Sequence, residues 1–320
     1  MKKTVIKVLS ILLTVIVLMT AAPLSSIFKL INFNWLGLSS IGYAFSANGK
    51  LGDAVNYTFD KDSGLLLITG SGDMYNFRYS DFPFGSDYGN GIKSVVIEEG
   101  ITSIGNYTFK YCSDLIDVSL PNSLLYIGVG AFSGCSELQS VTIPSGVSEI
   151  SNDSFVGCLK LKSVILPNDV TYIGLNAFSG CEALSDFIIP NSVNFIGDFA
   201  FSGCSSLSEI NIPESVLSIG NFTFENCVAL ESIIVPKNVE SIGIYAFPQE
   251  NDFIPYCYEN SYAESYFEDY SKRYLIIWDS TDDSTIFQKV NNKLSFEIDK
   301  ATRTLTVNCL GMISVRQEKE

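Results

Sequence analysis

Residues 138–158 read LQSVTIPSGVSEISNDSFVGC, and this stretch decides the fold because its pattern returns every 23 residues. Four residue types keep that spacing without an insertion. Their columns are Cys112, Cys135, Cys158, Cys181, Cys204 and Cys227; Phe109, Phe132, Phe155, Phe178, Phe201, Phe224 and Phe247; Pro121, Pro144, Pro167, Pro190, Pro213 and Pro236; and Ile104, Ile127, Ile150, Ile173, Ile196, Ile219 and Ile242. A fixed period of about 20–29 residues is typical of a leucine-rich solenoid.

A single period predicts one coil of that solenoid. Residues 138–143 alternate apolar and polar side chains, which predicts a short strand that Pro144 ends. A second short extended piece follows around Val147 and Ile150, and residues 154–158 form a tight turn. Seven such coils predict seven parallel strands on the concave face with tight turns on the convex side. One coil cannot bury its own apolar side chains, so the coils must stack at about 4.8 Å and be capped at both ends.

Two small-residue columns indicate where the coils crowd one another. A small residue precedes the Phe of every coil, so we expect close packing there. A Gly follows the Ile column in six coils, at Gly105, Gly128, Gly174, Gly197, Gly220 and Gly243. We expect the backbone at these glycines to need a positive φ. Ser151 replaces the glycine once, and we expect local strain in that coil.

The repeat divides the chain into five segments. These are a signal peptide (1–46), an N-terminal β cap (47–91), the leucine-rich repeat solenoid (92–247), a C-terminal cap with a short helix and a strand (248–279), and a tail (280–320). An alternating hairpin that turns through Asp60–Gly64 supports the first cap. Helical spacing at 261–267 and an apolar strand at 274–278 support the second.

The N-terminal segment has the pattern of a secretory signal. Lys2, Lys3 and Lys7 precede an apolar run over Val8–Ala22, which is too short to span a bilayer comfortably. We favour cleavage before Ala47; an earlier site near Ala22 and an uncleaved anchor are the alternatives. Residues 1–46 hold four Lys and no acid, so the remainder carries 16 basic and 35 acidic residues, a charge of −19.

The tail repeats the order of residues seen in the first cap. Phe296, Asp299-Lys300 and Gly311-Met312 follow the order of Phe59-Asp60-Lys61 and Gly72-Asp73-Met74. We interpret residues 285–315 as the opening hairpin of a second cap. A short appended β-element is the alternative.

Composition excludes several functions. With 35 acidic against 20 basic residues the formal charge is −15, which repels phosphate backbones, so no nucleic-acid partner is expected. The chain contains no His, which removes Ser–His, Cys–His and His-metal mechanisms. It also lacks a G-x-S-x-G motif and a phosphate-binding glycine loop. The sequence therefore predicts neither an enzyme nor a cofactor.

The cysteine column and one acidic loop are the remaining candidates for chemistry. Neighbouring ladder cysteines would have parallel Cβ atoms about 4.8 Å apart, which suits neither a disulfide nor a tetrahedral metal site. We therefore expect a structural ladder of buried thiols, whereas Cys257 and Cys309 could pair or stay reduced. Asp60, Asp62 and Gly64 suggest a calcium loop, but the glycine falls one position early, so we favour a polar turn and expect no metal.

The strand face is the most informative candidate for binding. Side chains between the inward Leu, Val and Ile columns must point outward. The partner-binding candidates on this face are Val96, Thr142, Ile165, Ile188, Asn211, Ile234, Asp186 and Glu209; Ser119 lies in the same outward column as Thr142. Ile165 and Ile188 lie on adjacent coils and form an apolar spot with polar neighbours, as protein interfaces often do. The alternative is that β-branched residues simply favour strands.

The pattern L-x-x-V-x-I-P-x-x-V-x-x-I-G-x-x-A-F-x-G-C over about residues 92–247 resembles the bacterial surface-antigen (BspA-like) class of leucine-rich repeats. Minor departures are Glu98 for the first Pro, and Tyr111 and Asn226 for the Gly before Cys. The resemblance implies a secreted or surface protein of gut or oral bacteria or protozoa, and several members are adhesins for host matrix proteins or other bacteria. We find no sortase motif and no cell-wall-binding repeat.

These observations together predict an exported, monomeric, non-catalytic protein that mediates adhesion or another protein–protein interaction through its strand face. Its partner would be a host matrix protein or another bacterial surface, and its contact with a membrane would be limited to the N-terminal segment. A first alternative is a carbohydrate-binding module that uses outer aromatic residues such as Tyr126 and Tyr172. A second is a remnant of a larger multidomain surface protein, which the tail suggests.

Overall fold

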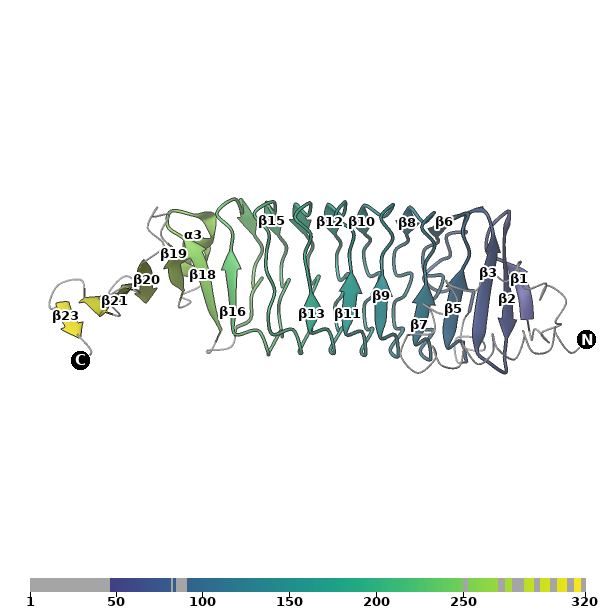
Figure 1. Cartoon of the computed structure of the whole chain (residues 1–320), viewed down its shortest axis with the longest axis horizontal. Coiled ribbons are helices and arrows are strands. Elements are labelled where there is room, and N and C mark those ends of the chain that lie inside the picture. The colour runs from purple at the N-terminus through teal and green to yellow at the C-terminus, as the bar shows by residue number, and fades with distance from the viewer. Residues whose placement is uncertain are drawn as a thin grey trace, which may run out of the picture.

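The computed structural model describes residues 47–81, 83–84, 91–249, 253–269 and 274–277, together with four strands between 285 and 317. The signal segment 1–46 lies outside the described residues. Figure 1 shows the coils stacked side by side into one elongated solenoid, with β1–β3 at one end and helix α3 near the other.

The first sheet contains the cap hairpin and the first five repeat strands. Its order is β1 (Ala47–Lys50), β2 (Val55–Asp60), β3 (Leu65–Gly70), β5 (Ser94–Ile97), β7 (Asp117–Ser119), β9 (Ser140–Thr142), β11 (Ser163–Ile165) and β13 (Asp186–Phe187). The first three strands are antiparallel, and from β3 onward each strand pairs in parallel with the next. Val141 lies opposite Val164 and Val164 opposite Phe187, so one step across the sheet equals one period of the sequence. The solenoid of parallel strands is confirmed.

Short strands on the second side of each coil make two further parallel sheets. They are β4 (Gly72–Asp73), β6 (Ile101–Ile104) and β8 (Tyr126–Ile127), then β10 (Glu149–Ile150), β12 (Tyr172–Ile173), β14 (Phe195–Ile196), β15 (Ser218–Ile219) and β17 (Ser241–Ile242). The extended piece expected around Ile150 is therefore β10. Ile150, Ile173 and Ile196 lie opposite one another in register, all pointing into the core.

The first sheet is interrupted at one coil. Six of the seven expected strands form, but residues 207–212 of the sixth coil are not in a strand. Pairing resumes with β16 (Ser232–Val235), which joins β18 (Ile254–Tyr258) and β19 (Leu275–Ile277). We attribute the gap to Phe187, which occupies a column that holds Val or Ile in the other coils. Its ring lies edge-on between Phe178 and Phe201, 4.9 Å from each, and takes more room than a Val side chain.

The core is a continuous set of columns that runs the length of the stack. The Phe rings are fully or almost fully buried and stack from coil to coil, with centroids 5.2 Å apart at the closest pair, Phe109 and Phe132, and 6.0 Å at the widest, Phe224 and Phe247. Ring planes are near-parallel, at 3° for Phe155 and Phe178. Offset aromatic stacking adds about 0.5–1.5 kcal/mol per pair beyond burial, so each coil stabilises both of its neighbours.

The expectation of positive φ at the Gly column after Ile is wrong. These glycines have no positive φ; instead a Cβ at Gly197 would lie 2.7 Å from the Gly174 carbonyl carbon, and one at Gly220 would lie 2.4 Å from the Asp198 nitrogen. The column is glycine because consecutive coils touch backbone to backbone there. Positive φ falls instead on two other columns, at Tyr107, Gly130, Asp153, Asn176, Phe199, Phe222 and Tyr245, and at Tyr111, Gly134, Gly157, Gly180, Gly203 and Asn226.

Ser151 fits the Gly column through a hydrogen bond. Its buried hydroxyl donates to the Ile127 carbonyl oxygen of the preceding coil at 2.6 Å. In the neighbouring coils the corresponding carbonyl oxygen accepts a backbone hydrogen bond: the N–H of Gly128 donates to Ile104, and the N–H of Gly174 donates to Ile150. Ser151 has no positive φ, so the expected strain does not arise from its backbone.

An aromatic contact joins the N-terminal cap to the first coil. Lys110 is buried, and its Nζ donates to the Tyr79 carbonyl oxygen at 3.0 Å. The same ammonium lies over the Tyr79 ring and 4.7 Å from the centroid of Tyr111. Cation–π contacts of this kind contribute about 0.5–2 kcal/mol. Other coils place a residue such as Ser133 at this position, so Lys110 is specific to the junction with the cap.

The C-terminal end of the stack is closed by helix α3 (Tyr262–Asp269) and by β18. Ser261 begins the helix: its Oγ accepts the N–H of Glu264 at 3.2 Å, and the Glu264 carboxylate accepts the N–H of Asn260 at 2.7 Å. The hydroxyl of Tyr266 accepts the N–H of Ala246, which fixes the helix against the last coil. The helix and the strand at 275–277 were predicted; β18, which contains Pro255, was not.

The tail forms a separate antiparallel sheet. Its strands are β20 (Thr285–Val290), β21 (Leu294–Asp299), β22 (Thr304–Cys309) and β23 (Ser314–Gln317). β21 and β22 have six residues each and are joined by four residues, as are β2 and β3 of the cap. In both hairpins an Asp ends the first strand, at Asp60 and Asp299. The backbone therefore repeats the cap hairpin, although β22 pairs with an antiparallel β23 where β3 pairs with a parallel β5.

Candidate functional site

The strand face is the outward side of the first sheet and of β16 and β18, and we use this name throughout. All eight residues proposed for it have side chains that point away from the core. Thr142, Ile165, Ile188, Asn211, Ile234, Asp186 and Glu209 are exposed, and Val96 is half-buried. The period-2 alternation places them there because the intervening Val, Ile and Leu side chains fill the interior.

The most exposed apolar side chains on this face are two isoleucines on neighbouring coils. Ile188 is 83% exposed and Ile165 is 62% exposed. The register that pairs Val164 with Phe187 sets Ile188 beside Ile165, one strand spacing apart. Thr142 lies on the other side of Ile165, in register with it on β9. Two adjacent isoleucines in water form an apolar spot that a partner can cover.

Carboxylates lie beside the isoleucines. Asp186 begins β13, two residues before Ile188, and Glu209 occupies the same column one coil further along. Both side chains are exposed. The apolar spot thus has an acidic border on the side of the sixth coil.

A shallow hollow opens where the sheet is interrupted. It has a volume of about 480 Å³ and is bordered by Asn211, Ile234, Glu214 and Tyr258 and by two residues of the proline column, Pro213 and Pro236. Ile234 is 48% exposed and lies in register with Tyr256 of β18. The sequence analysis did not identify Tyr256 and Tyr258, because they follow the last repeat and lie outside the helix and strand predicted for the C-terminal cap. The available signal was two aromatic residues at a spacing of two, which favours a strand.

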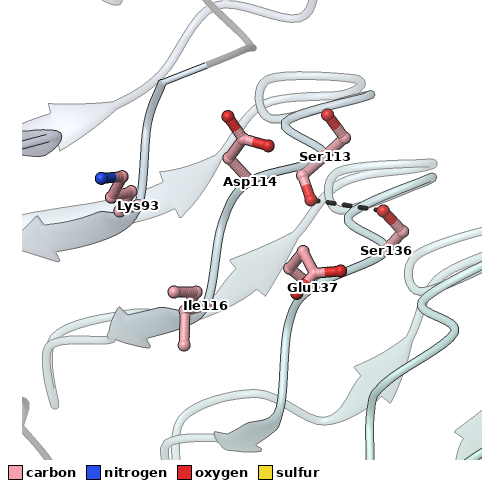
Figure 2. Close-up of a pocket in the computed structure, with 6 residues that line it drawn as sticks. All are labelled: Lys93, Ser113, Asp114, Ile116, Ser136 and Glu137. Carbon is pink, nitrogen blue, oxygen red and sulfur yellow. Dashed lines mark hydrogen bonds between the residues drawn. The ribbon is translucent and has the colours of Figure 1, made fainter.

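A second hollow lies at the beginning of the first three repeat strands. Its volume is about 530 Å³, and Figure 2 shows the six residues that line it: Lys93, Ser113, Asp114, Ile116, Ser136 and Glu137. The Ser136 hydroxyl donates to the Ser113 carbonyl oxygen at 3.2 Å, and Glu137 pairs with Lys160 at 2.7 Å. None of these lining groups forms a nucleophile–base pair, and the hollow is wide and open. It has the features of a polar surface depression.

The cysteine ladder lies inside the stack. All six side chains are buried as reduced thiols. The Sγ of Cys158 donates to the Phe132 carbonyl oxygen at 3.2 Å, and Cys135, Cys181, Cys204 and Cys227 make the same contact one period apart. Burial raises the pKa of Cys158 to about 12 and raises the pKa values of Cys112, Cys135, Cys181 and Cys204 as well. Thiols held neutral and inaccessible are poor nucleophiles and poor metal ligands. Cys257 is also a buried thiol, whereas the side chain of Cys309 lies outside the described residues.

The acidic loop of the cap forms a polar turn. The N–H of Asp62 and the hydroxyl of Ser63 donate to the Asp60 carboxylate at 3.1 and 2.7 Å, and these bonds lower its pKa. Gly64 closes the turn by donating to the Asp60 carbonyl oxygen with φ of +76°. Across the part of the chain that the structure describes, no group of three or more His, Cys, Asp or Glu side chains is placed to hold a metal ion. No helix in that part is long and apolar enough to cross a membrane.

Aromatic side chains form a further ladder on the turns at the C-terminal half. Phe199, Phe222 and Tyr245 stack with centroids 4.9 and 5.6 Å apart, and Tyr172 stacks on Phe195 at 5.0 Å. Tyr245 is 45% exposed, and the other four are half-buried. Most of each ring face is therefore covered by the next ring.

The repeat pattern matches the sequence profile of the BspA type leucine rich repeat region, in six copies over residues 85–196 and 175–292. Together these matches span well over half of the 320 residues. The chain belongs to the BspA-type leucine-rich repeat family. This family and its fold are typically non-catalytic, and repeat proteins of this kind generally mediate protein–protein interaction.

Solved structures similar to this BspA-type chain are bacterial leucine-rich repeat proteins. One from Bacteroides ovatus is 29% identical with a TM-score of 0.48, and the match covers 64% of this chain and 54% of that one. The chain thus spans about half of the length of that protein. A leucine-rich repeat protein of T. pallidum is 26% identical with a TM-score of 0.47, covering 63% and 92%. A search of curated proteins gave no match.

Proposed function

We propose that this BspA-type protein is exported to the cell surface or secreted and binds another protein through its strand face, without catalysing a reaction. Residues 1–46 would direct export, and residues 92–247 would present the binding surface between the two caps. The partner would be a host matrix protein or a surface protein of another bacterium, and the chain would act as a monomer.

The observation that supports binding at this face is the exposure of Ile188 and Ile165 side by side. An isoleucine side chain stabilises a folded protein by about 1.5–3 kcal/mol when it is buried rather than exposed to water. Ile165, on β11, and Ile188, just after β13, do not gain this stabilisation within the chain. A partner that covers the two side chains recovers it at the interface.

A binding screen tests the proposal. The purified protein is passed over immobilised extracellular matrix proteins and mucins at physiological salt. Saturable binding to a protein is expected, and Ile165→Asp combined with Ile188→Asp should abolish it while the unfolding temperature stays unchanged. Leu125→Asp with Leu217→Asp, which changes two exposed apolar residues just before β8 and β15 and outside the strand face, is the matched control. Binding that survives the isoleucine pair would exclude the strand face as the site.

A carbohydrate-binding function is the second candidate, and the stacked aromatics on the turns favour it. Tyr245 is the most exposed ring of that ladder, so Tyr245→Ala should weaken binding to a glycan array if this surface is used. Tyr126→Ala and Tyr172→Ala probe the same side of the coils on β8 and β12. An array with no saturable signal would remove this candidate, whatever the protein screen shows.

The tail suggests a third reading, in which residues 280–320 are a cap-like module from a larger multidomain architecture. The hairpin that β21 and β22 share with β2 and β3 supports it. Deletion of residues 280–320 should then leave the unfolding temperature of the solenoid unchanged, because α3 and β18 already close the stack. A large drop in that temperature would show instead that the tail is part of the C-terminal cap.

A further inference from the structure

We infer that the partner segment which occupies the C-terminal half of the strand face is cationic as well as apolar, with Lys or Arg side chains flanking aliphatic ones. This inference rests on the proposed function, since it specifies the chemistry of the partner at that same face. Three observations support it: carboxylates without an ion-pair partner, exposed isoleucines, and a hollow that Ile234 and Glu214 border.

Three carboxylates of coils five to seven have no ion-pair partner among the residues that the structure describes. Asp186, Glu209 and Glu231 are exposed, and within the described residues their carboxylates have neither an ion pair nor a hydrogen bond. Lys160, which pairs with Glu137, and Lys162 are on an earlier coil. Lys237, on the seventh coil, follows Pro236 at the end of β16 and lies beyond the columns that hold Asp186 and Glu209. Like charges on adjacent coils repel one another, and a cationic ligand relieves that repulsion.

The apolar and acidic side chains interleave on the surface. Ile188 follows Asp186 at a spacing of two residues on one coil, and Glu209 precedes Asn211 at the same spacing on the next coil. Glu214 borders the hollow of about 480 Å³ that Ile234 also lines. An occupant whose side chains only buried the isoleucines would leave these carboxylates desolvated without partners, which disfavours binding. An occupant with cations at the matching positions satisfies both requirements.

The charge of the face also disfavours other occupants. A second copy of this chain has a net charge of −15 and would bring acids against acids, and nucleic acid or anionic lipid would be repelled for the same reason. A protein segment with alternating aliphatic and basic residues is the occupant that matches the surface.

Three synthetic peptides of ten residues test the inference by fluorescence polarisation against the full chain. They alternate Val with Lys, Val with Glu, and Thr with Lys. We expect saturable binding of the Val–Lys peptide and at least about tenfold weaker binding of the other two, because each lacks one of the two matching features. Equal binding of the Val–Glu peptide overturns the cationic requirement, and equal binding of the Thr–Lys peptide overturns the apolar one.

Charge-reversal variants separate a local effect from the general acidity of the protein. Asp186→Lys with Glu209→Lys should weaken Val–Lys binding about tenfold and flatten its salt dependence. Glu149→Lys with Glu240→Lys changes the net charge by the same amount on exposed residues of the opposite side, β10 and the coil before β17, and should leave binding within about twofold. Equal losses in the two pairs overturn the inference, because binding would then follow net charge.

The same experiment distinguishes failure of the inference from failure of the proposed function. If Ile165→Asp with Ile188→Asp abolishes binding of the protein partner found in the screen while Asp186→Lys with Glu209→Lys leaves it intact, the strand face stands and the cationic partner is wrong. If neither pair changes it, the face itself is not the site.

Discussion

The inward columns and the strand face of this protein lie one residue apart on the same strands, yet their sequences behave in opposite ways. The inward column that precedes the outward one is Val or Ile in six of the seven coils, at Val95, Val118, Val141, Val164, Ile210 and Ile233, with Phe187 as the exception. The outward column next to it reads Val96, Ser119, Thr142, Ile165, Ile188, Asn211 and Ile234. Inward positions face the same environment in each coil, because each coil packs on a copy of itself. Outward positions face water and whatever binds there.

We infer from this difference that the uniform inward columns determine stability and that the variable outward column determines what the protein binds. A coil that changes its interior residue must fit two neighbours at once, whereas an outward residue can change without affecting the stack. Phe187 is the informative exception: a single larger ring in the interior coincides with the interruption of the sheet and with the hollow beside Ile234. A change of an interior residue can therefore alter the surface, but only where it interrupts the pairing of neighbouring strands.

The largest expected effect on stability comes from the buried thiols at alkaline pH. The folded pKa of Cys158 is raised to about 12, and the pKa values of Cys112, Cys135, Cys181 and Cys204 are raised as well, whereas an unfolded thiol ionises near pH 8.5. Above that pH only the unfolded chain loses these protons, so stability is complete below about 8.5 and falls as pH rises. Each thiol contributes about 1.4 kcal/mol per pH unit, or about 7 kcal/mol for the five at pH 9.5.

Urea titrations between pH 7 and 10 measure this loss directly. Cys158→Ala should reduce the slope of unfolding free energy against pH by one proton while leaving the remaining slope intact. Fast reaction of more than two thiols of the native protein with a thiol reagent at pH 8 would contradict the placement of the ladder inside the stack, because only Cys257 and Cys309 lie outside it.

The next largest effect is expected from an interior ring. Phe178→Ala removes a fully buried side chain that stacks on Phe155 and Phe201 at 5.5 Å, and should cost about 3–5 kcal/mol of unfolding free energy. The loss is measured by urea denaturation at pH 7. A cost below 1 kcal/mol would mean that neighbouring coils collapse into the space and that the stack is less tightly packed than the ring spacing indicates.

A smaller loss of unfolding free energy is expected from substitutions in the two glycine columns. Comparing them tests why each column contains glycine. Gly197→Asn should cost about 1–3 kcal/mol, because its Cβ would lie 2.7 Å from the Gly174 carbonyl carbon. Gly203→Asn should cost less than about 1 kcal/mol, because Asn tolerates the φ of +75° there, as Asn226 does one coil later. A loss for Gly203→Asn as large as the loss for Gly197→Asn would mean that the close backbone contact does not distinguish the two columns.

The period of the sequence was enough to predict the architecture because a solenoid has only local contacts. Because the columns repeat at a fixed spacing, the sequence determines which residues lie opposite one another. The parallel strands, the second extended piece and the outward position of Ile188 could therefore be derived from the sequence. The helix at the C-terminal end was predictable from its spacing, and Ser261 and Glu264 supply the matching cap.

Features that depend on contact between specific coils were not predictable in this way. The glycines after the Ile column were expected to need a positive φ. Their actual cause, the close approach of two backbones, cannot be read from the sequence. The role of Lys110 depends on the Tyr79 loop, which lies outside the repeat. The interruption beside Phe187 could have been suspected, because that residue breaks a column of Val and Ile. For the binding residues, the sequence places the face but contains no information on the ligand.

The smallest expected effect contrasts two neighbouring isoleucines that face opposite sides of one coil. Ile188 is 83% exposed and Ile189 is 4% exposed. Ile188→Thr should change the unfolding free energy by less than about 0.5 kcal/mol, because water already surrounds the side chain. Ile189→Thr makes the same chemical change inside the core and should cost about 2–4 kcal/mol, since it removes apolar contacts and buries a hydroxyl. Equal costs in urea denaturation would mean that Ile188 contributes to the fold, and its exposure would then cease to indicate a binding surface.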